Sequence, residues 1–178
     1  MQVHFEIWGN ITIESAPFPG SELIEFGNWY SPRESYGYIS SNLWRGQIFL
    51  VGGNGTGKNT TLRGFKLKLA REASSSVMLN VSLYNVTFNG SDWLPYRALV
   101  SNYTVNTSVA SQGIATFGSW INVSMPPYSL INQTRDAIVI SSSSDIILTD
   151  WMGNGGLGDY QYGNATSSND FGATWGSG

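Results

Sequence analysis

Apolar and polar residues alternate along most of this chain, which is the pattern of β-strands that bury one face. In the stretch 77–86, every second residue from Val77 to Leu83 is apolar, whereas the intervening Asn80 and Ser82 are polar. Helix periodicity is nearly absent. The other stretches that we predict to be strands are 3–7, 11–14, 48–51, 62–69, 96–105, 115–125, 137–141, 146–151, 160–162 and 171–175.

Roughly ten short strands with Gly, Asn and Ser turns between them are typical of an antiparallel two-sheet sandwich. We expect an all-β fold of the jelly-roll type. The stretch 17–42 is rich in Pro, Gly, Ser and Tyr, and we expect it to be irregular. A chain of 178 residues suits one domain with its own core. We expect residues 16–178 to form the sandwich and residues 1–15 to form an N-terminal strand segment that completes it.

Asparagine is concentrated in the triplet Asn-x-Ser/Thr, the acceptor sequence for N-linked glycans. Eleven of the fifteen asparagines lie in such triplets, and none of the triplets has proline in the middle. Within a strand the Asn and the Ser or Thr share one face, so their glycans would stand on the surface of the sheet. The sequence therefore predicts an extracellular, heavily glycosylated cell-surface protein. The eleven sites are Asn10, Asn54, Asn59, Asn80, Asn85, Asn89, Asn102, Asn106, Asn122, Asn132 and Asn164.

Charge and cysteine content exclude several classes of protein. Charged residues make up 12% of the chain and the net charge is -3, with only nine basic residues. Nucleic acid is therefore not an expected partner. The chain has no cysteine, which excludes disulfides, thiolate metal sites and cysteine nucleophiles. An exported protein without disulfides gains its stability from its core, from assembly or from bound ions, which favours a bacterial or archaeal surface.

No apolar run approaches the roughly twenty residues that span a bilayer, so we expect no membrane span. A signal peptide has a basic start followed by a long apolar segment. The stretch 1–8 lacks this pattern. Because the glycan acceptors indicate export, we interpret the chain as a processed form or a piece of a longer one.

The sequence offers no catalytic motif, and we predict that the protein is not an enzyme. Gly52–Asn59 is similar to a phosphate-binding loop, but Asn59 replaces the hydroxyl that would reach Mg²⁺. A strand pattern follows where a helix is required, so we interpret this stretch as a glycine-rich hairpin loop. His4 is the single histidine, which excludes a catalytic triad or a site with several histidine ligands. Glu22 and Glu25 are close in sequence but have no supporting motif for glycoside cleavage.

Oxygen-bearing side chains gather among glycines between 145 and 170. Asp145, Asp150 and Asp159 are candidate ligands of a structural Ca²⁺, which prefers hard oxygen donors on flexible loops. Their spacing matches no calcium-loop motif, and loop polarity alone is the alternative interpretation. Beyond this ion and covalent N-glycans, we expect no cofactor.

Aromatic residues are densest in and beside the stretch 17–42. Stacking on a pyranose ring is one use for such a cluster, and filling of the core or of a sheet edge is the alternative. Its members are Trp29, Tyr30, Tyr36, Tyr38 and Trp44.

One set of segments in chain order carries a resemblance to a known family. The segments are Gln47–Phe49, Thr61–Leu67, Val81–Asn85, Trp120–Pro126, Ala137–Ile140 and Trp151–Trp175. They resemble the extracellular jelly-roll sandwich modules that lie beside anchoring and adhesion segments in bacteria and archaea, over about two thirds of the chain. In that family a closing strand of the type Asp-Leu-Ala-Phe-Arg-Val-Tyr-Gly follows the Gly/Thr/Trp turn. Here the chain stops at Thr174–Gly178, whereas Gln2–Gly9 has the pattern of the closing strand.

The resemblance therefore implies that the N-terminal strand completes the sandwich, either in its own chain or in the next subunit. The second arrangement is similar to that of strand-donating archaeal pili and threads, and it favours a homopolymer with Val3, Phe5 and Ile7 as inserted anchors. We therefore expect a structural subunit of a glycosylated extracellular filament. The alternatives are a monomeric module that binds host or cell-surface carbohydrate in adhesion, and a viral coat or fibre protein.

Overall fold

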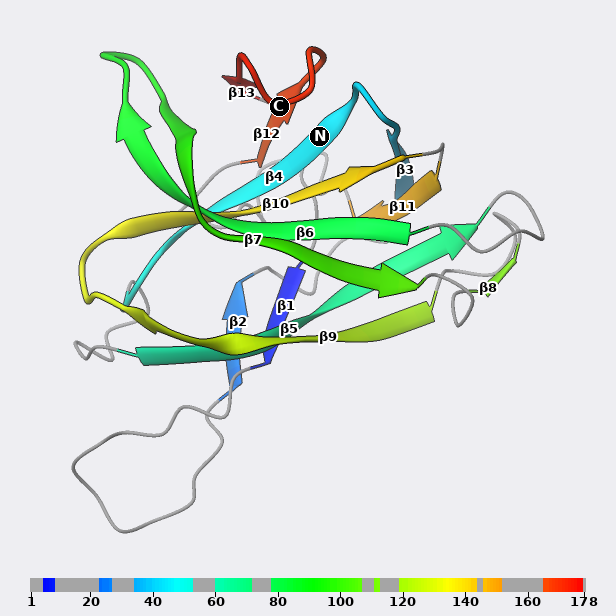
Figure 1. Ribbon diagram of the computed structural model, residues 1–178, viewed down its shortest axis with the longest axis horizontal. Coiled ribbons are helices and arrows are strands. Elements are labelled where there is room, and N and C mark those ends of the chain that lie inside the picture. Colours follow the sequence, from blue (N-terminus) through cyan, green and yellow to red (C-terminus); the bar gives the residue numbers. More distant parts are fainter. Residues whose placement is uncertain are drawn as a thin grey trace, which may run out of the picture.

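The computed structural model is an all-β protein with two sheets, one above the other in Figure 1. The structure describes residues 5–8, 23–26, 34–52, 60–71, 78–106, 111–112, 119–143, 146–151 and 165–177, with side-chain burial within 39–52, 61–64, 78–100, 123–143 and 166–176. Within these residues the strands are β1 (Phe5–Trp8), β2 (Leu23–Phe26), β3 (Glu34–Ile39), β4 (Trp44–Leu50), β5 (Thr60–Arg71), β6 (Met78–Phe88), β7 (Trp93–Asn106), β8 (Ser111–Gln112), β9 (Ser119–Leu130), β10 (Arg135–Ser142), β11 (Ile146–Trp151), β12 (Ala165–Ser168) and β13 (Gly176–Ser177).

The six-stranded sheet has the order β13-β12-β4-β10-β6-β7, and each neighbouring pair is antiparallel. β10 lies near its centre, where Ile138 is opposite Gln47 of β4 and Leu83 of β6. Beyond the centre, β6 and β7 continue as a long hairpin that curls away from the sheet at the upper left of Figure 1. The predicted all-β, antiparallel architecture is confirmed and is consistent with a β-sandwich.

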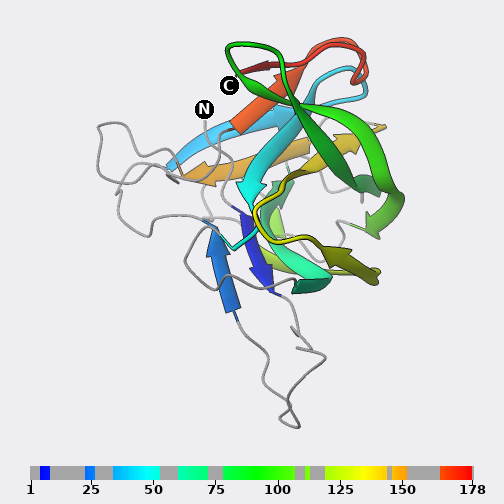
Figure 2. The ribbon, with the colours of Figure 1, turned by 90° about the vertical axis from the view of Figure 1, so that its left-hand side faces the viewer.

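The seven-stranded sheet is organised around β5. One edge of β5 pairs with β9, and the other edge pairs with β1 at Lys66 and Leu67 and with β11 at Leu69 and Ala70. β2 lies beyond β1, β3 lies beyond β11, and only the short β8 is parallel to β5. Figure 2 shows β1 and β2 side by side below the six-stranded sheet. The N-terminal strand is thus part of a sheet of its own chain.

A bulge bends the pair of β5 and β9 at Gly64. The register between the two strands shifts between Leu62 and Gly64. A Cβ atom on Gly64 would collide with the carbonyl oxygen of Val123. Only glycine allows the two backbones to come this close.

The core lies between the sheets and combines residues from both. In β6, Leu79, Val81 and Leu83 are buried, as the period of two predicts. Each such side chain stabilises the fold by roughly 1.5–3 kcal/mol through the apolar surface that it removes from water. The buried apolar residues of the described chain are Ile39, Ile48, Phe49, Val51, Leu62, Leu79, Val81, Leu83, Val123, Met125, Leu130, Ala137, Ile138, Val139 and Ile140.

The prediction that 17–42 is irregular is wrong in two places, since β2 and β3 lie within it. β3 pairs with β11 along its whole length, from Ile39 opposite Ile146 to Glu34 opposite Trp151. A distant partner therefore forms this strand in spite of the local composition, because β-propensity depends strongly on context.

The prediction of a strand at 171–175 is also wrong. The backbone turns there, with a φ of 60° at Phe171 and 82° at Gly172, values that an extended strand does not adopt. The loop that follows β4 is not a hairpin loop, because β4 and β5 belong to different sheets. The predicted strands at 11–14 and 160–162 lie outside the described residues.

Candidate functional site

The N-terminal strand β1 lies between β2 and β5 in the seven-stranded sheet. Phe5 is opposite Phe26 on one side and opposite Leu67 on the other. Both edges of β1 are therefore paired with strands of the same chain. Of the predicted anchors, Phe5 and Ile7 lie on this strand, whereas Val3 lies outside the described residues.

Four of the eleven predicted glycan acceptors have described side chains. Asn85 and Asn89 are exposed, and Asn80 and Asn132 are partly exposed. Asn102 and Asn106 lie on β7 and Asn122 on β9, with side chains outside the described set, and the acceptors outside the described residues are Asn10, Asn54, Asn59 and Asn164.

Burial in two strand triplets follows the expected alternation. Val81 is buried, and Asn80 and Ser82 on either side of it are partly exposed. In the triplet on β9, Val123 is buried and Ser124 is exposed. The valine of each triplet thus anchors the strand in the core.

Asn89 begins the loop of the hairpin between β6 and β7. Its side-chain oxygen Oδ1 accepts hydrogen bonds from the backbone N–H of Ser91 at 2.9 Å and of Asp92 at 2.8 Å. Its own backbone N–H donates to the carbonyl oxygen of Asp92 at 3.0 Å. Because Oδ1 faces the loop amides, the nitrogen Nδ2, to which an N-glycan would be attached, lies on the other side of the planar amide group.

Asn132 lies in a different setting, in the turn between β9 and β10. The Thr134 hydroxyl of this triplet donates to the carbonyl oxygen of Ile131 at 2.7 Å. Gln133 between them has a φ of 64°, in the left-handed region. The hydroxyl of the Asn132 triplet is thus hydrogen-bonded to the backbone of the turn. In the Asn89 triplet, by contrast, the bond to Asn89 comes from the backbone N–H of Ser91.

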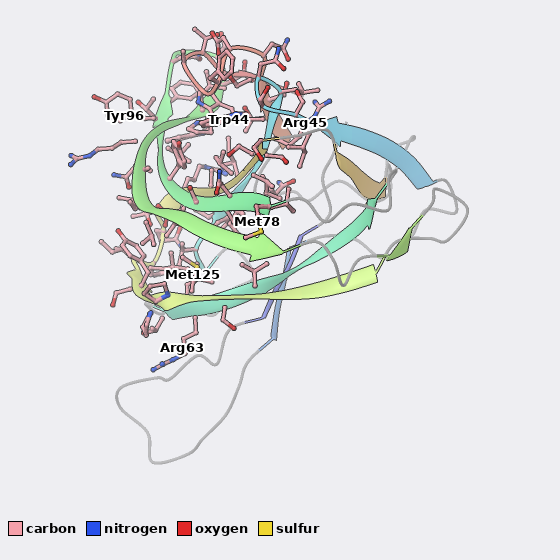
Figure 3. The ribbon with its side chains drawn as sticks, turned by 45° about the vertical axis from the view of Figure 1, so that its right-hand side comes forward. Trp44, Arg45, Arg63, Met78, Tyr96 and Met125 are labelled. Atoms are coloured by element: carbon pink, nitrogen blue, oxygen red, sulfur yellow. The ribbon has the colours of Figure 1, made fainter. Side chains whose placement is uncertain are left out.

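Trp44, Tyr84 and Trp175 form an aromatic group that we name the Trp44 cluster. The ring of Trp175 lies 6.5 Å from that of Trp44 at 62° and 6.2 Å from that of Tyr84 at 66°, between ring centroids. Both contacts are edge-to-face, an orientation that the ring quadrupoles favour. Tyr84 follows the buried Leu83 in β6, so the cluster lies on the face of the sheet opposite to the Leu83 side chain. Figure 3 shows Trp44 in the upper part of the view, on the six-stranded sheet.

The turn that brings Trp175 to the cluster is organised by Asp170. The Thr174 hydroxyl donates to its Oδ2 at 2.6 Å, and the Thr174 backbone N–H and the Ser168 hydroxyl donate to its Oδ1 at 2.8 and 2.7 Å. These hydrogen bonds, those from Thr174 first, lower the pKa of Asp170 to about 2. The Ser168 oxygen also accepts the backbone N–H of Gly172, so the turn is closed on both sides.

The structure divides the aromatic group that the sequence suggested. Trp44 contacts Trp175, which in turn contacts Tyr84, whereas Tyr36 and Tyr38 lie on β3 in the other sheet. Trp29 and Tyr30 lie outside the described residues. Phe171, at the tip of the Asp170 turn, is 63% exposed. Sequence analysis missed Tyr84 and Trp175 because only the fold brings them to Trp44.

The structure describes one of the three candidate calcium ligands. Asp150 lies on β11, and Asp145 and Asp159 lie outside the described residues. Among the described residues no group of three or more acidic, histidine or cysteine side chains is placed to hold a metal ion. Asp170 uses both carboxylate oxygens within its own turn. Structural Ca²⁺ stays a prediction.

A buried carboxyl group that sequence analysis missed lies on β10. Asp136 is 5% exposed, opposite Asn85 of β6 and Phe49 of β4. Burial raises its pKa to about 6. Its place directly before the apolar stretch 137–141 is the signal that could have indicated burial.

No helix in the described part of the chain is long and apolar enough to cross a membrane. Comparisons with protein-family models, curated proteins and solved structures found no match for this chain. The resemblance to jelly-roll surface modules therefore stays a prediction from the sequence pattern.

Proposed function

We propose that this protein is a structural subunit of an extracellular, glycosylated filament, with a jelly-roll sandwich completed by the N-terminal strand of a neighbouring subunit. The observation that carries the proposal is the position of β1, the first strand of the described residues, between β2 and β5. The eleven glycan acceptors support an exported, surface-exposed polymer.

Strand exchange explains how such a subunit would polymerise. The pairs that Phe5 makes with Phe26 and Leu67 inside one chain can form equally between β1 of one subunit and the sheet of the next. The hydrogen bonds are the same in both arrangements, so exchange changes their number little. A head-to-tail contact of this kind does not close on itself and propagates into a fibre.

The positions of the predicted glycans would restrict lateral contacts at two strand edges. In the described structure β7 and β9 each pair with a single strand, so each has an unpaired edge. Such edges are sites of lateral aggregation unless they are blocked. Asn102 and Asn106 on β7 and Asn122 on β9 would carry glycans on both of these strands. Sugar there would block lateral pairing at these two edges.

A disulfide trap tests the proposal directly because the chain has no cysteine of its own. Facing residues on neighbouring antiparallel strands have Cα atoms about 4.5–5.5 Å apart, within the range that a disulfide spans. We expect oxidised Phe5→Cys/Leu67→Cys protein to form a ladder of covalent oligomers on denaturing gels. Covalent monomer alone, together with a monomeric mass by light scattering, would contradict the proposal.

The matched control is Tyr84→Cys/Ala98→Cys, which joins facing residues of the β6–β7 hairpin. This pair lies within one hairpin, so it should give covalent monomer whether or not strands are exchanged. Phe5→Asp is the complementary variant, which should abolish the polymers and leave the sandwich folded. Long filaments of Phe5→Asp would also contradict strand donation.

A second candidate function, a monomeric carbohydrate-binding or adhesion module, is favoured by the Trp44 cluster with exposed Phe171 beside it. Aromatic faces on a rigid turn are suited to the apolar faces of sugars. Binding to a glycan array that is lost in Trp44→Ala, from a protein that is a sharp monomer, would favour this function over the filament.

A further inference from the structure

The end of the β6–β7 hairpin carries two exposed aromatic rings. Phe88 is 51% exposed and Trp93 is 37% exposed, and the two residues face each other across the hairpin. Their ring centroids lie 5.2 Å apart with an angle of 44° between the planes. We name the segment Phe88–Trp93 the hairpin tip. It lies where the hairpin projects beyond the sheet (Figure 1).

The rings of the hairpin tip have a fixed arrangement. The guanidinium carbon Cζ of Arg135, on β10, lies 5.2 Å from the centroid of the Trp93 ring. Trp93 thus contacts both a cation and Phe88, and the contact with the cation favours one position of the indole ring. Phe88 is the more exposed of the pair. Together the two rings form an apolar surface without a cover among the described residues.

The residue that follows Phe88 is a glycan acceptor. Asn89, Gly90 and Ser91 form the triplet, and consecutive Cα atoms are about 3.8 Å apart, so a sugar on Asn89 is attached one residue from Phe88. The bonds of Oδ1 to the Ser91 and Asp92 amides hold the Asn89 side chain and turn Nδ2 away from the loop. A covalently attached sugar at this position meets the rings at a high effective concentration.

We propose that Asn89 carries an N-glycan whose first sugar packs on Phe88 and Trp93 and stabilises the hairpin tip. In the attachment step, Nδ2 attacks the anomeric carbon of a phosphate-activated sugar donor bound to a glycosyltransferase. The N–C bond forms as the C–O bond to the phosphate breaks, and one Nδ2 proton passes to a base of the transferase. Oδ1 keeps both loop hydrogen bonds. The inference rests on the glycosylation in the proposed function.

The ring of a pyranose has a face rich in C–H groups, which packs on the negative face of an aromatic ring. Packing there removes apolar surface of Phe88 from water, so the glycan should stabilise the folded hairpin. An exposed aromatic pair on a projecting hairpin is otherwise a site for unwanted contacts. The sugar thus covers this surface and supports the strand pair at the same time.

The test is a cycle of four glycoproteins: the natural sequence, Ser91→Ala, Phe88→Thr and the double variant. Ser91→Ala removes the hydroxyl that the acceptor triplet needs but keeps the backbone N–H that binds Asn89. Peptide mapping should find sugar on Asn89 in the natural sequence and in Phe88→Thr. We expect Ser91→Ala to lower the Tm by about 2–4 °C in the natural background and by about 1 °C or less in Phe88→Thr.

Two results would overturn the inference: Asn89 without sugar, or an equal loss of Tm in both backgrounds. If Phe88→Thr does not fold, Trp93→Thr replaces it in the cycle. NMR of the natural glycoprotein gives a second readout, since ring currents should shift the ring protons of the first sugar upfield, and their absence would also contradict packing. The mass of Ser91→Ala by light scattering tests the filament independently, because polymers should persist there whatever happens at Asn89.

Discussion

The two aromatic groups of the six-stranded sheet are built in opposite ways. The Trp44 cluster collects rings from β4, β6 and the C-terminal turn, which are far apart in the sequence. The hairpin tip collects its rings from within six consecutive residues. The cluster therefore depends on the whole fold and on one turn conformation, whereas the hairpin tip depends mainly on its own loop. The effects of a mutation should therefore spread across the Trp44 cluster but stay local at the hairpin tip.

The largest difference should come from a single added methyl group. Gly172 has a φ of 82°, and a Cβ atom there would lie 2.5 Å from Cζ3 and 2.7 Å from Cε3 of Trp44. Backbone strain and overpacking together should make Gly172→Ala lose about 2–4 kcal/mol in the free energy of unfolding. Urea denaturation followed by tryptophan fluorescence measures this loss.

Gly90 in the hairpin tip provides the control for this experiment. Its φ is 104°, yet an added Cβ would meet nothing within 4 Å. Gly90→Ala should therefore show backbone strain without overpacking and should lose about 1–3 kcal/mol less than Gly172→Ala. Equal losses would mean that the contact with Trp44 does not constrain the C-terminal turn.

Sequence alternation predicted the strands that bury one face against the other sheet. β6 follows the period of two closely, and its alternating residues are buried as expected. β3 was missed because its formation depends on β11, more than a hundred residues later in the chain. The C-terminal turn was predicted as a strand because its aromatic composition resembles one. The left-handed backbone of Phe171 depends on hydrogen bonds to Asp170 that no periodicity reveals.

The candidate sites also differ in whether a local sequence signal or the fold identifies them. The triplet at Asn89 is a local signal, and sequence was sufficient to identify it. The pairing of Trp44 with Trp175 and the burial of Asp136 depend on the fold, so sequence analysis missed both. The position of β1 next to β5 is likewise a long-range pairing. Alternation predicted a strand at 3–7, but only the resemblance of this segment to a closing strand indicated that it completes a sheet.

Two carboxyl groups extend the comparison to pH. Burial raises the pKa of Asp136, at the base of the hairpin, from 3.8 to about 6, whereas hydrogen bonds lower that of Asp170, in the C-terminal turn, from 3.8 to about 2. The stability that Asp136 contributes is present below about pH 3.8 and is lost as the pH rises through about 6. At 1.36 kcal/mol per pKa unit, this change amounts to at most about 3 kcal/mol.

Denaturation of the natural protein and of Asp136→Asn between pH 4 and pH 8 measures this contribution. The amide cannot ionise, so the stability of the variant should change less over this range, and the two curves should separate as the pH rises. Parallel curves would show that the carboxyl group is solvated in the folded state. The contribution of Asp170 has the opposite sign. It is present above about pH 3.8 and lost as the pH falls through about 2.

A smaller effect concerns the contact between Trp44 and Trp175. A double-mutant cycle of Trp44→Leu and Trp175→Leu isolates the edge-to-face interaction from the loss of apolar surface. We expect a coupling energy of about 0.5–1.5 kcal/mol, the usual range for an aromatic pair in this orientation. Tyr84→Phe is the control, because it keeps the ring that Trp175 contacts and should leave the coupling unchanged. A coupling near zero would mean that Trp175 is held by its turn alone.

The smallest effect should be found at the hairpin tip, in the contact between Arg135 and Trp93. The cycle of Arg135→Gln and Trp93→Leu should give a coupling energy of about 0.5–1 kcal/mol, because the site is partly exposed and water weakens the attraction of the cation to the ring. Lysine at position 135 keeps the charge and should retain part of the coupling. Coupling as strong as that of Trp44 with Trp175 would contradict the view that the hairpin tip is a local unit, since Arg135 belongs to β10 at the centre of the sheet.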